Sequence, residues 1–176
     1  MINPYLLASS ITFDTIVLGK QKSFSTITLI LFSAGFHALA FTIGLVLGQN
    51  LINLIGHIDH WISFAIFTFL GSFSIQAFLN FDKDNKISQV KSYIELFLIA
   101  AVLSIDAAII GASSSNLITT PHFVIFLIAI SSAVFVFIGK YINDLINAYN
   151  QKFLKLFEGL LFWSVGLGIL ISHING

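Results

Sequence analysis

The stretch LSIDAAIIG, residues 103–111, places one carboxylate, Asp106, inside a run of apolar and small residues. A charged side chain at the centre of a membrane helix costs about 2.5–3.5 kcal/mol on insertion scales, so intramembrane aspartates are rare and usually functional. A second stretch, ITFDTIVLG at residues 11–19, carries Asp14 at the equivalent place. The matching positions are Asp14 and Asp106, Thr12 and Ser104, and Gly19 and Gly111. These related aspartates predict one shared function.

The composition of the chain is that of a membrane protein. Of its 176 residues, 57% are hydrophobic and 9% are charged, and the mean hydropathy is +0.96. This balance is too apolar for a soluble core with a solvated surface, so a lipid bilayer is the expected surrounding. The absence of cysteine excludes disulfides and thiolate metal sites, and a net charge of zero gives no indication of a nucleic-acid partner.

Six apolar segments follow one another along the chain, and most reach the ~20 residues that a helix needs to cross the hydrocarbon. They cover residues 4–19, 25–48, 61–79, 93–112, 122–139 and 156–173. Backbone polar groups in lipid must be satisfied within the segment, so each is expected to be a helix. The start MINPYLLASS lacks the basic region of a cleaved signal peptide, so we expect its segment to remain. The predicted fold is an all-α membrane protein with a single domain over residues 1–176.

The lysines of the chain all fall in the odd-numbered loops of this six-helix arrangement. The first loop holds Lys20 and Lys22, the third holds Lys83, Lys86 and Lys91, and the fifth holds Lys140, Lys152 and Lys155. Loops rich in lysine face the cytoplasm by the positive-inside rule. We therefore expect a multi-pass protein of the bacterial cytoplasmic membrane with both termini outside.

The two halves of the chain have the features of a repeat. The two aspartates are 92 residues apart in sequence. In the segments that follow them the offset is 95, which aligns Ala38 with Ala133 and Gly44 with Gly139. A three-helix unit followed by its copy must enter the membrane from the opposite side, which is typical of secondary transporters. We expect two inverted repeats, over about 1–80 and about 93–176.

The paired aspartates predict a cation site. Two close carboxylates repel each other unless a proton or a cation lies between them, and a divalent cation satisfies both. The alternative is that each aspartate makes a local polar contact or pairs with a lysine. Hydroxyl groups lie close to both aspartates in sequence and either bind the same cation or donate to their own backbone carbonyls. These hydroxyl residues are Ser10, Thr12 and Ser104.

Two further residues inside the apolar segments are candidates for the same site. His37 lies midway along the second segment, where it either binds metal, carries a proton or donates to a neighbouring helix. Glu158 lies near the cytoplasmic start of the sixth segment, as an inner gate ligand, as a partner of Lys155 or as a side chain that reaches the interface. Glycines follow both aspartates at the same spacing, and Gly19 and Gly111 are candidate sites of a helix break.

The loop GHIDH, residues 56–60, is the candidate for a site outside the membrane. His57, Asp59 and His60 have the close spacing of metal ligands. The alternative is an interfacial loop next to Trp61, an aromatic residue of the kind found at membrane surfaces.

Six short motifs carry a resemblance to a known family. They are TFDTI at 12–16, Gly19-Lys20, ALAFTIG at 38–44, DHWISF at 59–64, SIDAA at 104–108 and Glu158-Gly159. Together they resemble the bacterial MntP-type manganese efflux pumps, which belong to the wider LysE-like group of exporters. Two positions depart from the family pattern: Phe41 stands where the family tends to carry proline, and His37 where it more often has glutamate or glutamine.

The residues and the resemblance together predict an exporter of a divalent metal, most simply Mn²⁺, working by alternating access. Asp14 and Asp106 are the expected central ligands, and Mn²⁺ is a transported substrate with no permanently bound cofactor. The sequence contains no Walker motif, so the expected energy source is an ion gradient or the membrane potential, with proton coupling open. The alternatives are an exporter of another cation or of an amino acid, a non-transporting scaffold, or an intramembrane enzyme, which the sequence disfavours. The oligomeric state is not given by the sequence.

Overall fold

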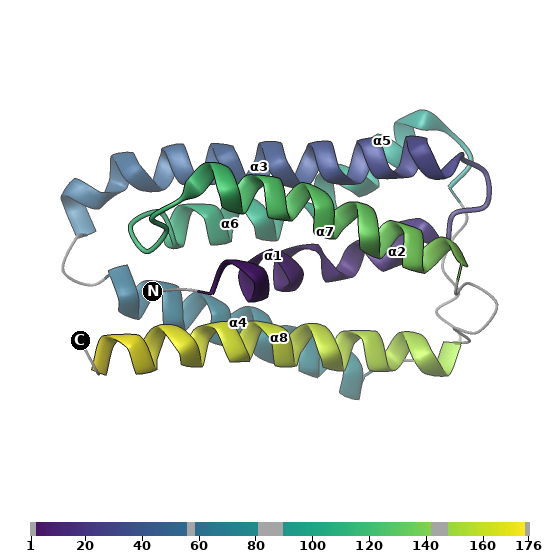
Figure 1. Cartoon of the computed structure of the whole chain (residues 1–176). Helices are drawn as coiled ribbons and strands as arrows, with labels where there is room; N and C mark the ends of the chain where they lie inside the picture. The colour runs from purple at the N-terminus through teal and green to yellow at the C-terminus, as the bar shows by residue number, and fades with distance from the viewer. Residues whose placement is uncertain (1–2, 56–58, 81–89, 142–147, 175–176) are drawn as a thin grey trace.

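A computed structural model describes residues 3–55, 59–80, 90–141 and 148–174. In these ranges every regular element is a helix, and the long helices run side by side as a bundle (Figure 1). The elements are α1 Pro4–Thr12, η1 Phe13–Thr15, α2 Ile16–Gly19, α3 Thr26–Ile55, α4 Asp59–Leu79, α5 Tyr93–Leu103, α6 Ile105–Ser113, α7 Pro121–Tyr141 and α8 Ala148–Ile174.

The expected six apolar segments are present in the fold. Among the described residues, five helical stretches are long and apolar enough to cross a membrane, and Pro4–Gly19 is a shorter apolar one. Two boundaries differ from the expectation by more than two residues. The second segment continues to Ile55 instead of ending at residue 48, and the sixth begins at Ala148 instead of residue 156. The earlier start of α8 matters because it puts Lys155 inside a helix and not in a loop.

The first and fourth segments are interrupted close to their aspartates. A single 3₁₀ turn, Phe13–Thr15, separates α1 from α2 and contains Asp14. Ser104 separates α5 from α6 with φ −91° and ψ 0°, two residues before Asp106. A break was expected at Gly19 and Gly111. At Gly111 that expectation is wrong, because this glycine lies inside α6, whereas Gly19 is the last residue of α2.

The side chains next to the interruptions explain their position. The Thr12 hydroxyl donates to the Ala8 carbonyl at 2.8 Å, and the Ser104 hydroxyl donates to the Ala101 carbonyl at 2.9 Å. Such bonds compete with the backbone ladder and often bend helices. A matched pair of hydroxyl residues therefore marks where both aspartate-bearing helices leave regular α geometry.

The glycines do not interrupt the helices but let neighbouring helices approach closely. A Cβ atom on Gly19 would collide with the Val136 carbonyl, and one on Gly111 with the Phe41 carbonyl. In the same way, Gly139 faces the Ile16 carbonyl and Gly44 faces the Ala108 carbonyl. Small residues at such crossings drive helix packing in membranes, where lipid gives no hydrophobic force between helices. Thus α2 packs on α7, and α6 packs on α3.

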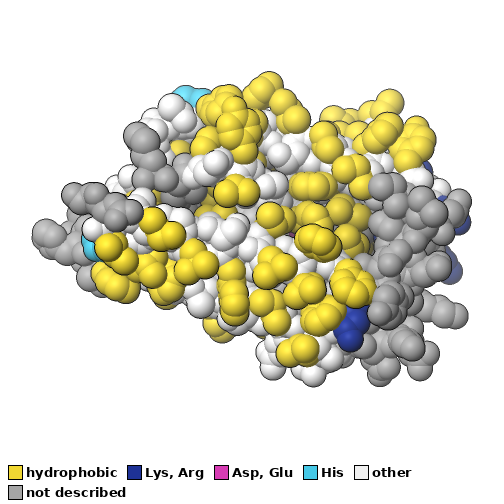
Figure 2. Space-filling model, turned by 60° about the horizontal axis from the view of Figure 1, so that its bottom comes forward, with side chains coloured by type: hydrophobic (Ala, Val, Ile, Leu, Met, Phe, Trp, Pro, Cys, Tyr) yellow, Lys and Arg dark blue, Asp and Glu magenta, His cyan; other side chains and the backbone are white. Residues whose placement is uncertain are grey.

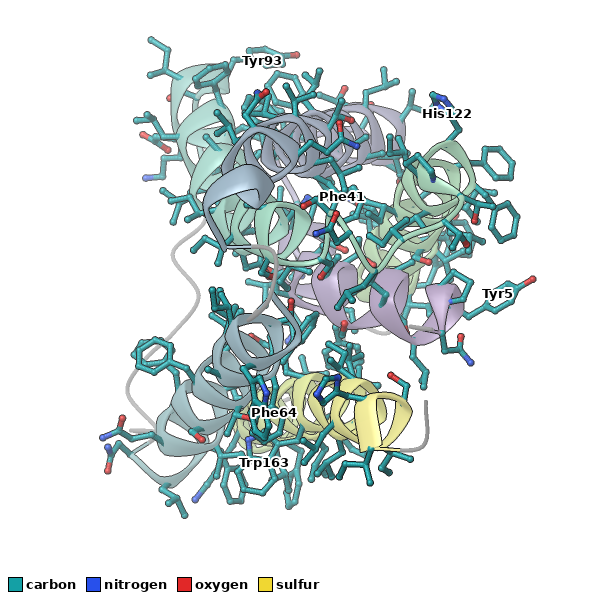
Figure 3. The ribbon with its side chains drawn as sticks, turned by 90° about the vertical axis from the view of Figure 1, so that its left-hand side faces the viewer. Tyr5, Phe41, Phe64, Tyr93, His122 and Trp163 are labelled. Atoms are coloured by element: carbon teal, nitrogen blue, oxygen red, sulfur yellow. The ribbon has the colours of Figure 1, made fainter. Side chains whose placement is uncertain are left out.

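Helices α4 and α8 form a pair of their own. Figure 3 shows them side by side below α1, with α3, α5, α6 and α7 gathered on the other side of α1. Gly71 and Gly159 let the two backbones approach, and the Trp163 indole donates to the Thr68 carbonyl at 3.3 Å. The aspartate-bearing segment α1–η1 therefore lies between the α4–α8 pair and the remaining helices.

Charged and apolar side chains separate along the bundle. Both termini lie at one end in Figure 1, and α2 ends, α5 begins, α7 ends and α8 begins at the other. The described lysines belong to that second end, as the sequence predicted. Figure 2 shows hydrophobic side chains across the described part of one face, with lysine at one end and histidine at the opposite end. This is the surface expected of a chain that spans lipid.

Candidate metal centre

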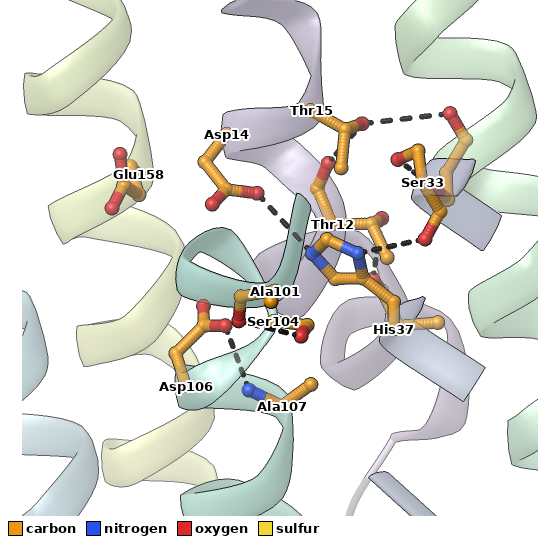
Figure 4. A network of polar contacts seen from close by, with 12 residues as sticks. Thr12, Asp14, Thr15, Ser33, His37, Ala101, Ser104, Asp106, Ala107 and Glu158 are labelled. Carbon is orange, nitrogen blue, oxygen red and sulfur yellow. Dashed lines mark hydrogen bonds and ion pairs between the residues drawn. The ribbon is translucent and has the colours of Figure 1, made fainter. Parts of the chain in front are cut away.

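Three side chains from three different segments converge in the middle of the bundle. Asp14 comes from η1, His37 from α3 and Asp106 from α6, and one ligand atom of each lies within 4.8 Å of the others. Figure 4 shows His37 and the two carboxylates around one space. A separation of this size suits a single ion bridging all three. The two aspartates that the sequence paired are thus brought together, and His37 joins them.

The orientation of His37 is fixed by its second ring nitrogen. Nδ1 lies 2.9 Å from the Ser33 carbonyl oxygen, which only accepts, so Nδ1 carries the proton and donates. Nε2 of the neutral ring is then an unprotonated lone pair, which is the form that binds metal. Ser33 itself is held by a 2.6 Å hydrogen bond between its hydroxyl and that of Ser132 on α7.

In the neutral ring, the Nε2 lone pair of His37 faces a carboxylate oxygen and not a donor. Nε2 is 3.6 Å from Oδ1 of Asp14, and the His37 side chain is 0% exposed and that of Asp14 10% exposed. Neither atom has a hydrogen-bond partner within the described residues. Buried polar atoms are normally paired, so two facing electron-rich atoms without a donor need a cation or a proton between them. The arrangement fits a metal site.

Asp106 is held by the start of its own helix. Its Oδ1 accepts from the Ala107 N–H at 2.7 Å, in the first turn of α6. The free N–H groups and the dipole at a helix start favour a negative charge there. Ser104, which interrupts the helix before Asp106, thus creates the helix start that stabilises this carboxylate inside the membrane.

The three predicted hydroxyl ligands use their protons within their own helices. Ser10 donates to the Leu7 carbonyl at 2.9 Å, and Thr12 and Ser104 donate to Ala8 and Ala101 as described above. This is the backbone-bonded alternative of the sequence analysis. A donating hydroxyl keeps lone pairs on its oxygen, so metal ligation by these residues stays a prediction.

Glu158 lies outside the three-residue cluster and is fully partnered. Its Oε1 accepts from the Ser74 hydroxyl at 2.9 Å, and its Oε2 accepts from the Lys155 ammonium at 2.6 Å. Of the alternatives for this residue, the pair with Lys155 is present. The interaction connects α8 to α4 through Ser74, at the edge of the aspartate site (Figure 4).

The external histidine site stays a prediction. His57 falls outside the described residues, as do the side chains of Asp59 and His60. His173 on the same face packs its ring against Trp61, with ring centroids 6.0 Å apart.

Sequence reasoning missed the residues that orient the cluster. Thr15 donates to the Thr12 carbonyl at 2.7 Å and lies 3.4 Å from the Ser132 carbonyl, which joins η1 to α7. Ser33 and Ser132 hold the histidine. Of these residues, Ser33 alone could have been identified from the sequence, because it precedes His37 by four residues and so lies on the same face of the helix.

Comparison with known proteins assigns the chain to a family. A sequence profile described as "Putative manganese efflux pump" matches residues 20–170. The chain belongs to this family. The matched range contains His37, Asp106 and Glu158 and begins after Asp14. The manganese efflux family consists of membrane transporters and not of enzymes, in agreement with the sequence prediction.

Individual relatives carry the same description over most of the chain. A protein of Crocosphaera subtropica is 30% identical over 159 residues, covering 90% of this chain and 84% of the relative. One of Methanosarcina mazei is 29% identical over 154 residues, with coverages of 88% and 82%. One of Bifidobacterium adolescentis is 22% identical over 184 residues, with coverages of 99% and 98%. No solved structure matches the chain.

Replacing the unpartnered carboxylate should stabilise the metal-free protein. In Asp14→Asn, the amide can donate to the His37 Nε2 lone pair and so removes the repulsion between the two facing atoms. We expect the free energy of unfolding of the metal-free protein to rise by about 1–3 kcal/mol. Thermal unfolding of the detergent-purified protein measures this, with Asp14→Ala as the control that removes the charge without adding a donor. Equal or lower stability of Asp14→Asn relative to Asp14→Ala contradicts the assigned geometry.

Proposed function

We propose that this protein exports a divalent metal ion, Mn²⁺ first, across the cytoplasmic membrane. The observation that carries the proposal is the convergence of Asp14, His37 and Asp106, with two facing atoms that lack a donor. Carboxylates are hard oxygen ligands suited to Mn²⁺, and the sequence offers no thiolate for a softer metal. The family and the relatives described above support the same substrate.

Each residue of the cluster has its own role in the proposed site. Asp14 and Asp106 are the central ligands and supply two negative charges, which balance one divalent ion. His37 is the third ligand through Nε2, with the Ser33 carbonyl holding the ring. Mn²⁺ favours octahedral sites, so further positions remain for water or for the oxygens of Ser10, Thr12 and Ser104.

The proposed site lies at the interface of two inverted repeats. The close glycine contacts support this arrangement, because they occur in matched pairs. Gly19 on Val136 and Gly111 on Phe41 are related by the sequence offsets of 92 and 95, and so are Gly139 on Ile16 and Gly44 on Ala108. Each half thus packs its first helix on the second helix of the other half. Substrate sites near the midplane at such interfaces are a general feature of secondary transporters.

Alternating access would follow from movement of the α4–α8 pair relative to the other helices. The aspartates lie on the segments next to this pair, so a small rotation changes which end of the site is open. The metal would enter from the lysine-rich cytoplasmic end and leave at the end that holds both termini. An ion gradient or the membrane potential would supply the energy, with protons as the candidate coupling ion.

A second candidate substrate follows from one residue. His37 places an imidazole where the resemblance leads one to expect glutamate or glutamine. Nitrogen ligands favour later transition metals such as Co²⁺, Ni²⁺ and Zn²⁺ over Mn²⁺ more than an oxygen ligand does. We propose export of such a cation as the alternative. Competition among these ions and Mn²⁺ for uptake into proteoliposomes distinguishes the two.

The proposed function predicts protection from manganese in a bacterium that lacks its own exporter. The intact chain should restore growth at high Mn²⁺ and lower the manganese content of the cell. Asp14→Asn and Asp106→Asn should abolish protection, because each removes a charge that balances the ion. The matched control is Asn116→Asp or Lys91→Met, which changes one charge away from the cluster. Protection by both aspartate variants at normal membrane levels would show that the aspartates are structural.

The orientation is testable because the natural chain has no cysteine. Lys91 and His122 are exposed, and α5 and α7, which begin next to them in sequence, begin at opposite ends of the bundle (Figure 1). In intact cells, a membrane-impermeant maleimide should label His122→Cys, whereas Lys91→Cys should react only after permeabilisation. The reverse pattern would place the termini in the cytoplasm and contradict the predicted orientation.

A further inference from the structure

Lys155 is paired with Glu158 next to the acidic cluster, and the proposed function gives it no role. It lies on α8 one turn before Glu158, and its ammonium donates to Glu158 Oε2 at 2.6 Å. Its side chain is 36% exposed, whereas that of Glu158 is 12% exposed. The lysine therefore extends from the cytoplasmic end toward the interior along α8, and its charged end is held by a more buried carboxylate.

The charge of Lys155 is held close to the metal cluster. Its ammonium is bound by Glu158, α8 packs against the η1 turn that carries Asp14, and Glu158 lies beside Asp14 and Asp106 in Figure 4. The two aspartates and Glu158 carry three negative charges when ionised, and Lys155 neutralises one of them. The remaining charge of −2 is balanced by one divalent ion.

The contacts of Glu158 argue against its use as a metal ligand in this state. Both of its oxygens are occupied, one by Ser74 and the other by Lys155. It also lies outside the group of ligand atoms formed by Asp14, His37 and Asp106. A carboxylate so placed holds a lysine and not a metal. Its position next to the aspartates keeps that lysine within electrostatic reach of them.

We propose that Lys155 is a tethered cation that competes with the transported metal for Asp14 and Asp106, and that Glu158 is the positioning residue that holds it back. The inference rests on the proposed metal-export function. When the metal leaves, two close carboxylates in a membrane interior need a positive charge, and the lysine on the neighbouring helix supplies it without a second ion. Because α8 belongs to the α4–α8 pair, the proposed rocking movement changes the distance between Lys155 and the aspartates.

The proposal predicts a specific pattern of variants. Glu158→Gln frees the ammonium to compete, so Mn²⁺ binding should weaken by about 10-fold or more. Adding Lys155→Met to it removes the competitor, so the double variant should bind within about 3-fold of the intact protein. Lys155→Met alone should bind at least as tightly as the intact protein. A direct ligand role for Glu158 predicts no such rescue.

The test is Mn²⁺ binding to the full-length purified protein by isothermal titration calorimetry, on samples shown to be monodisperse and helical. The matched control is Lys152→Met, which removes the same charge one turn earlier on α8, where the ammonium lies 4.7 Å from the centre of the Phe78 ring. This control should bind like the intact protein. Should Glu158→Gln fail to fold, the double variant and Lys155→Met still decide the matter, since weaker binding by either overturns the proposal.

The outcomes separate this inference from the proposed function. A double variant as weak as Glu158→Gln makes Glu158 a ligand and overturns the tethered cation, while metal export stands. Unchanged binding by Glu158→Gln also overturns the tethered cation alone. No Mn²⁺ binding by the folded intact protein overturns both, and that result is recognised from the intact protein before any variant is considered.

Discussion

The structure depends on the cost of keeping two carboxylates and an imidazole lone pair together inside a membrane. Each carboxylate is expensive in hydrocarbon, and close like charges increase the cost. The fold lowers it at one of the two carboxylates: Asp106 accepts a hydrogen bond from the Ala107 N–H at the start of α6. The repulsion that remains is between Asp14 Oδ1 and the His37 Nε2 lone pair, which face each other and have no hydrogen-bond donor within the described residues. A cation bound between these two atoms would remove that repulsion, which is the basis of the proposed metal site.

Glycine residues and hydroxyl residues shape this site in two different ways. The glycines bring helix backbones into contact, as Gly139 does at Ile16, and so set the spacing of the bundle. The hydroxyl residues Thr12 and Ser104 bond their own backbones and end regular helix close to the aspartates. A polar interruption of a membrane helix is tolerated only where protein or a cavity surrounds it. In this chain both interruptions lie where the three ligand candidates meet.

The membrane helices, the position of the lysines and the pairing of the two aspartates could be predicted from the sequence for physical reasons. The apolar segments follow from the thickness of the bilayer, and the lysines at one end follow from the electrostatics of insertion. The pairing of Asp14 with Asp106 could be predicted because a carboxylate in an apolar segment is energetically costly and therefore rare.

The contacts that orient His37 could not be predicted, because Ser33 and Ser132 are ordinary helix residues that meet only after folding. The helix breaks were misplaced because glycine permits a break but does not require one. Lys155 was assigned to a loop because the amphipathic first turns of α8 are less apolar than the rest of the helix.

The central claim is that one metal ion is held by Asp14, Asp106 and the imidazole of His37. The most direct measurement is pulsed electron paramagnetic resonance of Mn²⁺ bound to the purified protein, which detects nitrogen atoms coordinated to the ion. The account predicts the signal of a single imidazole nitrogen in the intact protein and its loss in His37→Gln, with Mn²⁺ still bound through the aspartates. Bound Mn²⁺ without nitrogen coupling, or a coupling that survives in His37→Gln, would contradict it.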